Sequence, residues 1–221
     1  MEVPLLELKR VSKIFPYGLK KGNMILNDIN FIVKKSQTLA ILGQSGCGKT
    51  TLCRCLAGIE QPNSGQIFFE GKQIYNKRTP DERRNIQIVF QNPVASLNPN
   101  LTIKKILEEP LVIHKISKSV WHSEIMNTIN AVGLDESFLS MFPIQLSGGQ
   151  CQRINIARAI LLKPKLLICD EPISSLDILS QMMILNLLKD LKTQCDMTYI
   201  FVSHDEEIVK KIADKIVRLH A

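Results

Sequence analysis

Glycines, a lysine and hydroxyl side chains are concentrated in one stretch between an apolar run, Thr38–Leu42, and a helical stretch, Lys49–Ala57. Its residues are Gly43, Gln44, Ser45, Gly46, Cys47, Gly48, Lys49, Thr50 and Thr51. Glycines let successive backbone N–H groups converge on phosphate oxygens, and the helix that follows adds its positive end. The stretch fits G-x-x-x-x-G-K-[ST] and predicts a nucleoside triphosphate site. In it, Lys49 reaches the β- and γ-phosphates and Thr50 offers its hydroxyl to Mg²⁺.

A second apolar run, Lys165–Cys169, ends in two carboxylates, Asp170 and Glu171. The carboxyl end of a strand is where a doubly wound sheet binds its ligand, so we expect Asp170 to hold Mg²⁺ through water. Glu171 is then placed to take a proton from an attacking water, which favours hydrolysis over a simple kinase reaction. The alternative is an acidic turn after a core strand.

The residues Leu146 to Gln150 read Leu-Ser-Gly-Gly-Gln. Ser147 is a good N-cap for the helix that follows, and Gly148 and Gly149 expose backbone amides at its positive end. A chain with one triphosphate loop needs a second anion site only if a head-to-tail dimer closes each site on the nucleotide of the other subunit. A well-capped helix without a ligand is the alternative.

Together these motifs resemble the nucleotide-binding subunit of an ABC transporter, and the resemblance covers nearly the whole chain. It implies an ATPase that uses ATP and Mg²⁺. Three further elements match the family in order. Gln91 corresponds to its Q-loop glutamine, which senses Mg²⁺ and the membrane subunit. Ser174–Asp177 corresponds to its D-loop, with Ser175 where alanine is more common. His204 corresponds to its switch histidine, which touches the γ-phosphate.

The resemblance assigns roles to the motif residues. It implies catalytic roles for Glu171, His204 and Gln91, and metal binding by Thr50, Gln91 and Asp170. It implies nucleotide contacts for the phosphate loop and for Ser147, Gly148, Gly149, Gln150 and Asp177. The family also stacks an aromatic side chain on adenine. Phe15 and Tyr17 both lie in the corresponding region, and a core or surface role is the alternative for each.

Two segments narrow the resemblance to the peptide/nickel importer group: 91–99 followed by Ile103–Pro110, and 177–181 continuing into Ile184–Leu191. Gly46-Cys47-Gly48 is similar to the shorter second ATPase of such systems. The group implies ATP-driven uptake of peptides, nickel or metal complexes. It implies a second ATPase subunit (a heterodimer, or alternatively a homodimer), two membrane-spanning permease subunits and, indirectly, an extracytoplasmic substrate-binding protein. The chain is then expected at the cytoplasmic face of the membrane.

The composition agrees with this interpretation. The chain has 221 residues, 45% of them apolar, and a net charge of +7. That charge alone suits nucleic acid, an anionic membrane, a phosphorylated ligand or a solvated surface. With the motifs in place, we expect no nucleic-acid partner. The six cysteines show no zinc spacing and are expected to be reduced thiols. No apolar run reaches the ~18 residues of a membrane span.

The apolar runs and helical stretches that must position these motifs indicate an α/β fold. We expect a P-loop NTPase core with a mostly parallel sheet. Buried strands are expected at 38–42, 86–90, 165–169 and 199–203. A small antiparallel β subdomain is expected around Gln66–Glu70, and a last strand at Lys215–Leu219. Helices are expected at 103–109, ending before Pro110, at 120–132, and from Gly148 to Pro164.

We expect one ABC ATPase domain over 1–221, with the nucleotide-binding core in 1–91 and 151–221 and a helical subdomain in about 92–150. Related chains continue past the strand at 215–219 through a further strand, whereas this sequence stops at Ala221, and we expect no catalytic position to be lost. Two other functions remain open from the residues: a non-transport ATPase of the same superfamily acting on nucleic acid or ribosomes, and a regulatory subunit that does not hydrolyse ATP.

Overall fold

The structure, a computed structural model, describes residues 3–17, 20–75 and 77–219, with the side chains of 16–22 left outside that description. The chain divides into two compact units, Met1–Arg83 with Thr198–Ala221 and Arg84–Met197. Each unit combines strands with helices, so the predicted α/β class is confirmed. None of the described helices is both long enough and apolar enough to span a membrane.

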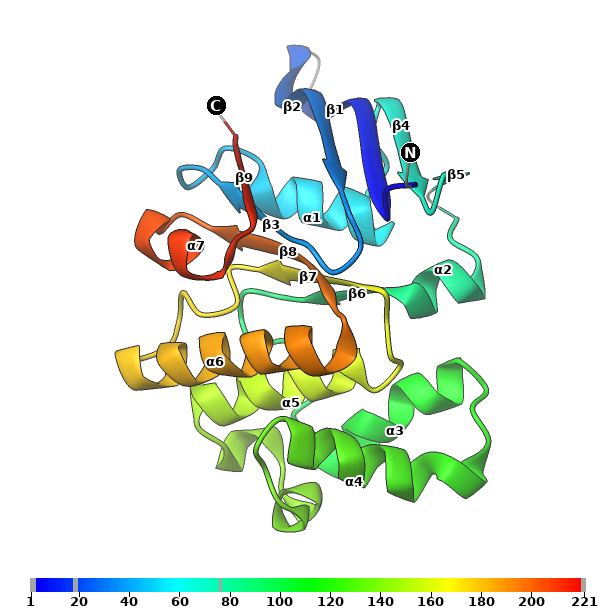
Figure 1. Cartoon of the computed structure of the whole chain (residues 1–221), viewed down its shortest axis with the longest axis vertical. Helices are drawn as coiled ribbons and strands as arrows, with labels where there is room; N and C mark the ends of the chain where they lie inside the picture. The colour runs from blue at the N-terminus through cyan, green and yellow to red at the C-terminus, as the bar shows by residue number, and fades with distance from the viewer. Residues whose placement is uncertain (1–2, 18–19, 76, 220–221) are drawn as a thin grey trace. The chain divides into compact units, whose positions relative to one another are not determined.

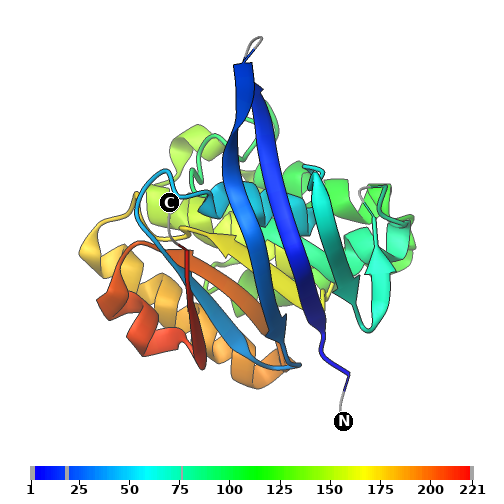
Figure 2. The same ribbon diagram turned by 90° about the horizontal axis from the view of Figure 1, so that it is seen from above.

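The first unit contains an antiparallel sheet in the order β2-β1-β4-β5, whose strands lie side by side in Figure 2. Its strands are β1 (Leu6–Tyr17), β2 (Lys20–Val33), β4 (Ser64–Phe69) and β5 (Lys72–Ile74). The strand expected near Gln66–Glu70 is therefore present as β4. The long β1–β2 pair beside it was not predicted.

The same unit holds three parallel strands in the order β8-β3-β9, bounded as β3 (Thr38–Leu42), β8 (Thr198–Ser203) and β9 (Lys215–Arg218). Every residue of β3 and β8 is buried, as expected for parallel strands covered on both faces. Helix α1 (Lys49–Ala57) has the bounds predicted for it. Helix α7 (Glu206–Ile212) packs on β3 and β8, and its Val209 meets Ala40 and Leu42 of β3.

The second unit contains the parallel pair β6 (Ile86–Val89) and β7 (Leu166–Asp170) with a group of helices (Figure 1). The longer helices are α3 (Ile103–Ile113), α4 (Trp121–Ala131), α5 (Gly148–Ile160) and α6 (Ile178–Cys195). Helix α5 lies at the centre of this unit, because it packs against α3, α4, α6 and β6. The short elements are α2 (Pro80–Asn85), η1 (Lys118–Val120), η2 (Glu136–Ser140) and η3 (Pro143–Gln145).

Helix α3 differs from the prediction, because it continues through Pro110 to Ile113. The expected end before Pro110 is wrong. A proline inside a helix lacks one N–H donor and crowds the preceding turn. Here Leu107 and Leu111 are 0% and 1% exposed. Burial of these two side chains on either side of Pro110 offsets the cost of the missing hydrogen bond.

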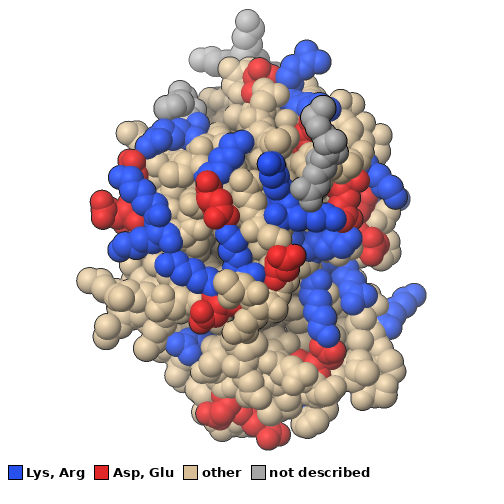
Figure 3. All heavy atoms as spheres, viewed as in Figure 1, with Lys and Arg blue, Asp and Glu red and all other residues tan. Residues whose placement is uncertain are grey.

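Acidic side chains break up the basic surface. On the face drawn in Figure 3, Lys and Arg alternate with Asp and Glu. Several of the lysines and arginines form ion pairs, among them Lys13 with Glu60, Lys163 with Glu124 and Arg218 with Glu206. Much of the excess positive charge is thus spread over a mixed, solvated surface.

Candidate functional site

The phosphate loop joins β3 to α1, as the sequence predicts. Gly48 caps α1 in the left-handed conformation, at φ 95°, and no side chain caps the first turn. Lys49 is only 5% exposed, and its Nζ donates hydrogen bonds of 2.8 Å to the carbonyl oxygens of Gly43 and Gln44. The loop therefore holds a full positive charge at the N-terminus of a helix, where both the ammonium and the helix dipole favour an anion.

Close approaches require two of the loop glycines. A Cβ on Gly48 would lie 2.7 Å from the carbonyl oxygen of Ile25, and one on Gly43 would lie 2.5 Å from Cys47 Sγ. Gly46, at φ 84°, has open space where its Cβ would be. The loop is thus packed tightly on one side and open at Gly46, as backbone that must approach a ligand closely requires.

His204 lies at the same sheet edge as the phosphate loop. In the parallel pair of β3 and β8, Leu42 is in register with Ser203. Gly43 and His204 are the next residue of each strand, and His204 is exposed. The structure therefore brings together two features that lie more than 150 residues apart in the sequence.

Of the two candidates for stacking on adenine, the structure describes the side chain of Phe15 but not that of Tyr17. Phe15 is half-buried on β1, opposite Asn23 of β2, and Ile25 of the same strand is the residue that approaches Gly48. The Lys13 ammonium lies 4.8 Å from the centre of the Phe15 ring, so a cation–π contact already uses one face of that ring. The side chain of Tyr17 lies outside the described residues.

In the second unit the acidic strand and the Q-loop glutamine converge. Val89 of β6 is in register with Cys169 of β7, so the segments that follow both strands leave the same edge. Gln91 Nε2 donates to Glu171 Oε2 at 3.3 Å and lies 3.4 Å from Ser174 Oγ. Glu171 has a positive φ of 46°, which turns the chain sharply after β7. The contact brings together two residues that the sequence analysis named separately.

Asp170 ends β7 and is 2% exposed. The neighbouring residue Cys169 is also buried. Burial raises the pKa of the Cys169 thiol, and the charge of Asp170 raises it further. The strand end therefore places the carboxyl group of Asp170 in buried surroundings.

The Leu-Ser-Gly-Gly-Gln segment forms the N-terminus of α5 as predicted. Ser147 Oγ accepts from Gln150 N at 3.2 Å, and Gln150 Oε1 accepts from Ser147 N at 2.9 Å, which is a capping box. Both side chains are thus engaged with the backbone of the turn, and Gly148 is exposed.

The N-terminus of α6 lies against this turn. A Cβ on Gly149 would be 2.7 Å from Ser180 Oγ. Ser180 in turn donates from its N–H and its hydroxyl to the Asp177 carboxylate, at 2.9 and 2.7 Å. Asp177, predicted as a nucleotide contact, is therefore the N-cap of α6 in this structure.

Three side chains that the sequence analysis did not single out hold the loops of this unit. Gln152, Asn155 and Arg158 of α5 donate to the carbonyl oxygens of Pro172, Pro93 and Ser96. Their signal in the sequence is weak. It consists only of polar residues at intervals of three within a helix whose other positions are mostly apolar.

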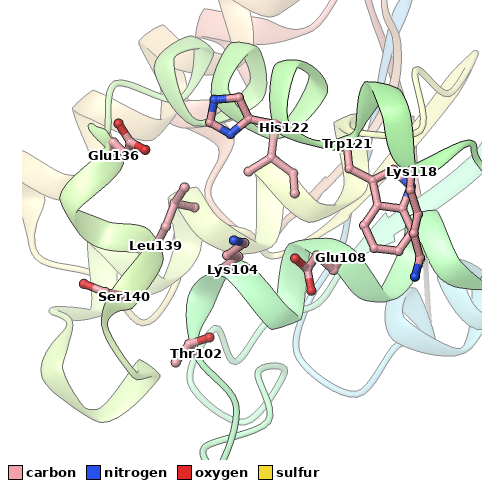
Figure 4. A pocket seen from close by; sticks show the side chains of 10 residues that line it. Thr102, Lys104, Glu108, Lys118, Trp121, His122, Glu136, Leu139 and Ser140 are labelled. Carbon is pink, nitrogen blue, oxygen red and sulfur yellow. The ribbon is translucent and has the colours of Figure 1, made fainter.

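A pocket of about 540 Å³ lies between α3, α4 and η2, with Trp121, His122, Lys104 and Glu108 among its lining side chains (Figure 4). None of the predicted site residues lines it. Within the described part of the chain, no three His, Cys, Asp or Glu side chains are grouped so that they could hold a metal ion.

Comparisons with known proteins agree with these features. Residues 26–174 match the family described as ABC transporter. The oligopeptide transport ATP-binding protein AppF of Bacillus subtilis (strain 168) is 41% identical over 96% of this chain and 68% of its own length. The dipeptide transport ATP-binding protein DppF of Escherichia coli (strain K12) is 38% identical over 100% of this chain and 69% of its own length.

Two solved structures are similar over nearly the whole chain. One is the dimeric post-hydrolysis state of the ATP-binding cassette MJ0796 bound to ADP and Pi, with a TM-score of 0.84 and 30% identity over 97% of this chain and 94% of that one. The other is cbiO1 from Clostridium perfringens, part of the ABC transporter complex cbiONQ, with a TM-score of 0.85 and 30% identity over 99% and 85%. Since the family match spans more than half of the sequence, this chain belongs to the ABC transporter family, among its ATP-binding proteins.

Proposed function

We propose that this chain is the ATP-hydrolysing subunit of an importer that takes up peptides across the cytoplasmic membrane. The observation that carries the proposal is the contact between Gln91 and Glu171 at the ends of two paired strands, in a chain that also has a complete phosphate loop. Among the substrates left open by the sequence, peptides are favoured because the relatives are named as oligopeptide and dipeptide transport proteins.

The phosphate loop binds the triphosphate in this proposal. Lys49 contacts the β- and γ-phosphates, and the backbone N–H groups of 43–51 surround them. His204 contacts the γ-phosphate from the neighbouring strand. Phe15 or Tyr17 stacks on adenine. Ser147, Gly148, Gly149 and Gln150 bind the nucleotide held by the second ATPase subunit, with Asp177 beside them.

Thr50, Gln91 and Asp170 each carry an oxygen atom of the hard kind that Mg²⁺ prefers, and in this proposal they would hold the ion together with water. The buried Asp170 supplies the charge, and Gln91 directs its amide nitrogen to Glu171, which leaves its amide oxygen for a cation. When bound, Mg²⁺ neutralises the charge that develops on the phosphates.

Glu171 acts as the general base in this scheme. Its carboxylate accepts a hydrogen bond from Gln91, which helps to orient it, and in this proposal the carboxylate takes a proton from the attacking water. The chain works as a peripheral subunit at the cytoplasmic face, together with a second ATPase subunit and two permease subunits.

The test is phosphate release by the complex that co-purifies with the tagged full-length chain from membranes of its host. We expect Glu171→Gln to bind ATP but to turn over ~100-fold more slowly or worse, because the base is lost. Glu136→Gln, an exposed glutamate that lines the separate pocket, is the matched control and should retain normal turnover. Near-normal turnover of Glu171→Gln would remove Glu171 from the role of base.

A further inference from the structure

Helix α5 carries a row of buried hydrogen-bonding side chains. Gln152 and Asn155 are 0% and 2% exposed, and Arg158 is half-buried one further step of three along the helix. Residues three apart lie on neighbouring turns of a helix, so these three side chains follow one another along α5, and we call them the ladder. Arg158 Nη2 donates to Asn155 Oδ1 at 3.2 Å and thereby joins two of the members.

The ladder reaches the two loops that carry Gln91 and Glu171. Asn155 Nδ2 donates to the carbonyl oxygen of Pro93 at 2.8 Å, two residues after Gln91. Gln152 Nε2 donates to the carbonyl oxygen of Pro172 at 2.6 Å, one residue after Glu171. Helix α5 therefore fixes the loop after Gln91 and the loop after Glu171, each through a hydrogen bond to a proline carbonyl oxygen.

The loop that follows Gln91 is itself stiff. Ser96 Oγ donates to the carbonyl oxygen of Asn92 at 2.6 Å, and Ala95 N donates to Asn92 Oδ1 at 3.1 Å. Arg158 Nη1 holds the far end of this loop through the carbonyl oxygen of Ser96, at 2.8 Å. Because these hydrogen bonds restrict the loop, fixing the carbonyl oxygens of Pro93 and Ser96 also restricts the position of Gln91.

We propose that Asn155 and Arg158 are positioning residues that set Gln91 against Glu171. The inference rests on the proposed function, because the pair they position is the proposed general base and its partner. The Gln91–Glu171 hydrogen bond is long, at 3.3 Å, so a small displacement of the loop would break it. A misplacement of ~1 Å at a reacting group can cost ~100-fold in rate.

The same helix offers a matched control. Arg153 is a half-buried arginine of α5 that also donates to backbone carbonyls, those of Val132 and Gly133, at 3.4 and 3.1 Å. These carbonyls follow α4 and do not belong to the loops of Gln91 or Glu171. Arg153 Nη2 also contacts Met183 Sδ of α6 at 3.2 Å. Arg153→Gln therefore removes the hydrogen bonds of another α5 arginine to backbone carbonyls without touching the ladder.

The first test measures hydrogen–deuterium exchange of the full-length chain by mass spectrometry and needs no activity. Arg158→Gln should speed exchange at the amides of residues 91–97 and leave 130–134 unchanged. Arg153→Gln should do the reverse. Unchanged protection of 91–97 in Arg158→Gln would overturn the inference.

The second test is a double-mutant cycle on phosphate release by the membrane-purified complex. Arg158→Gln should lower kcat ~10- to 100-fold with little change in the KM for ATP, and Arg158→Lys, which can still reach Ser96, should recover part of the loss. In a Gln91→Ala background, Arg158→Gln should cost little more, because both changes act through the same contact.

Losses in kcat that simply multiply would overturn the inference, since they would show that Arg158 acts independently of Gln91. The wild-type complex and Arg153→Gln distinguish this outcome from failure of the proposed function. If both hydrolyse ATP normally while the losses multiply, only the ladder is wrong. If the wild-type complex does not hydrolyse ATP, the proposed function is wrong and the exchange experiment alone decides the ladder.

Discussion

Lys49 combines a full positive charge with near-complete burial, and two backbone carbonyls at 2.8 Å hold its ammonium in the loop. An ammonium group attracts a phosphate, and the loop has open space at Gly46, where a phosphate could approach. At this scale, we expect one side chain to contribute much of the affinity of the proposed nucleotide site.

We therefore expect Lys49→Met to weaken ATP binding ~10- to 100-fold, the range for one hydrogen-bonded charged group. Isothermal titration of the purified chain with ATP measures the change. Lys163→Met, which removes a surface lysine paired with Glu124, is the control and should bind ATP like the wild type. Wild-type affinity in Lys49→Met would contradict the assignment of the loop.

The reactivity of the cysteine thiols tests which of these residues are buried. Five of the six are buried and Cys195 is exposed. Burial raises the pKa of Cys55 to about 11 and also raises the pKa of Cys151. Because the thiolate is the reactive form, iodoacetamide at pH 8 should label Cys195 first in the native protein.

Peptide mapping by mass spectrometry follows this labelling. Cys195→Ser should leave the native chain nearly unlabelled, and the same variant in urea should label at all five remaining positions. Equal rates at Cys55 and Cys195 in the native protein would contradict the described packing.

At the scale of the elements, helix ends do much of the positioning. Asp177 caps α6, and hydrogen bonds from the Ser180 hydroxyl and N–H hold the pKa of its carboxyl below the usual value of 3.8. A carboxyl whose pKa is lower in the folded state stabilises the fold above its unfolded pKa, and this contribution is lost as the pH falls through the folded value.

We expect Asp177→Asn to keep a good N-cap and to lose this dependence. Urea unfolding at pH 5 and pH 3 should show a smaller loss of stability on acidification than in the wild type. Asp190→Asn, on the same helix and away from the cap, should lose as much stability between pH 5 and pH 3 as the wild type. A loss as large in Asp177→Asn as in the wild type would mean that the cap makes no contribution to acid sensitivity.

The elements also show what a sequence can and cannot predict. Strand ends were predictable, because short apolar runs are followed directly by polar or glycine-rich residues. The strands β3 and β8 end one residue before Gly43 and His204, and β7 ends at Asp170. The helix through Pro110 was not, because its continuation depends on tertiary burial of Leu107 and Leu111. The β1–β2 pair was missed because it lacks regular alternation; its register shifts repeatedly along the strands.

Some residues of the candidate site could likewise be predicted from the sequence, and others could not. Motif residues were identified by type and spacing, and Gln91 and Glu171 proved to be in contact. Asn155 and Arg158 were not identified, because their partners are backbone carbonyls 62 residues away, which have no signature in the sequence. A side chain that recognises a carbonyl oxygen places no constraint on the type of residue that supplies it.

For the whole molecule, the central claim is that an ATPase of this family powers peptide uptake. The net charge of +7 does not require a nucleic-acid partner, since acidic side chains are interspersed among the basic ones on the face drawn in Figure 3 and several of the basic ones form ion pairs. The alternative, a non-transport ATPase acting on nucleic acid or ribosomes, predicts a different dependence of hydrolysis on added partners.

The most direct measurement is therefore uptake of a labelled peptide by proteoliposomes that contain the membrane-purified complex, the substrate-binding protein and enclosed ATP. We predict that the peptide accumulates while phosphate is released, and that both stop with Glu171→Gln. Phosphate release without accumulation of any of a panel of di- and oligopeptides, together with stimulation by DNA or ribosomes, would contradict the account.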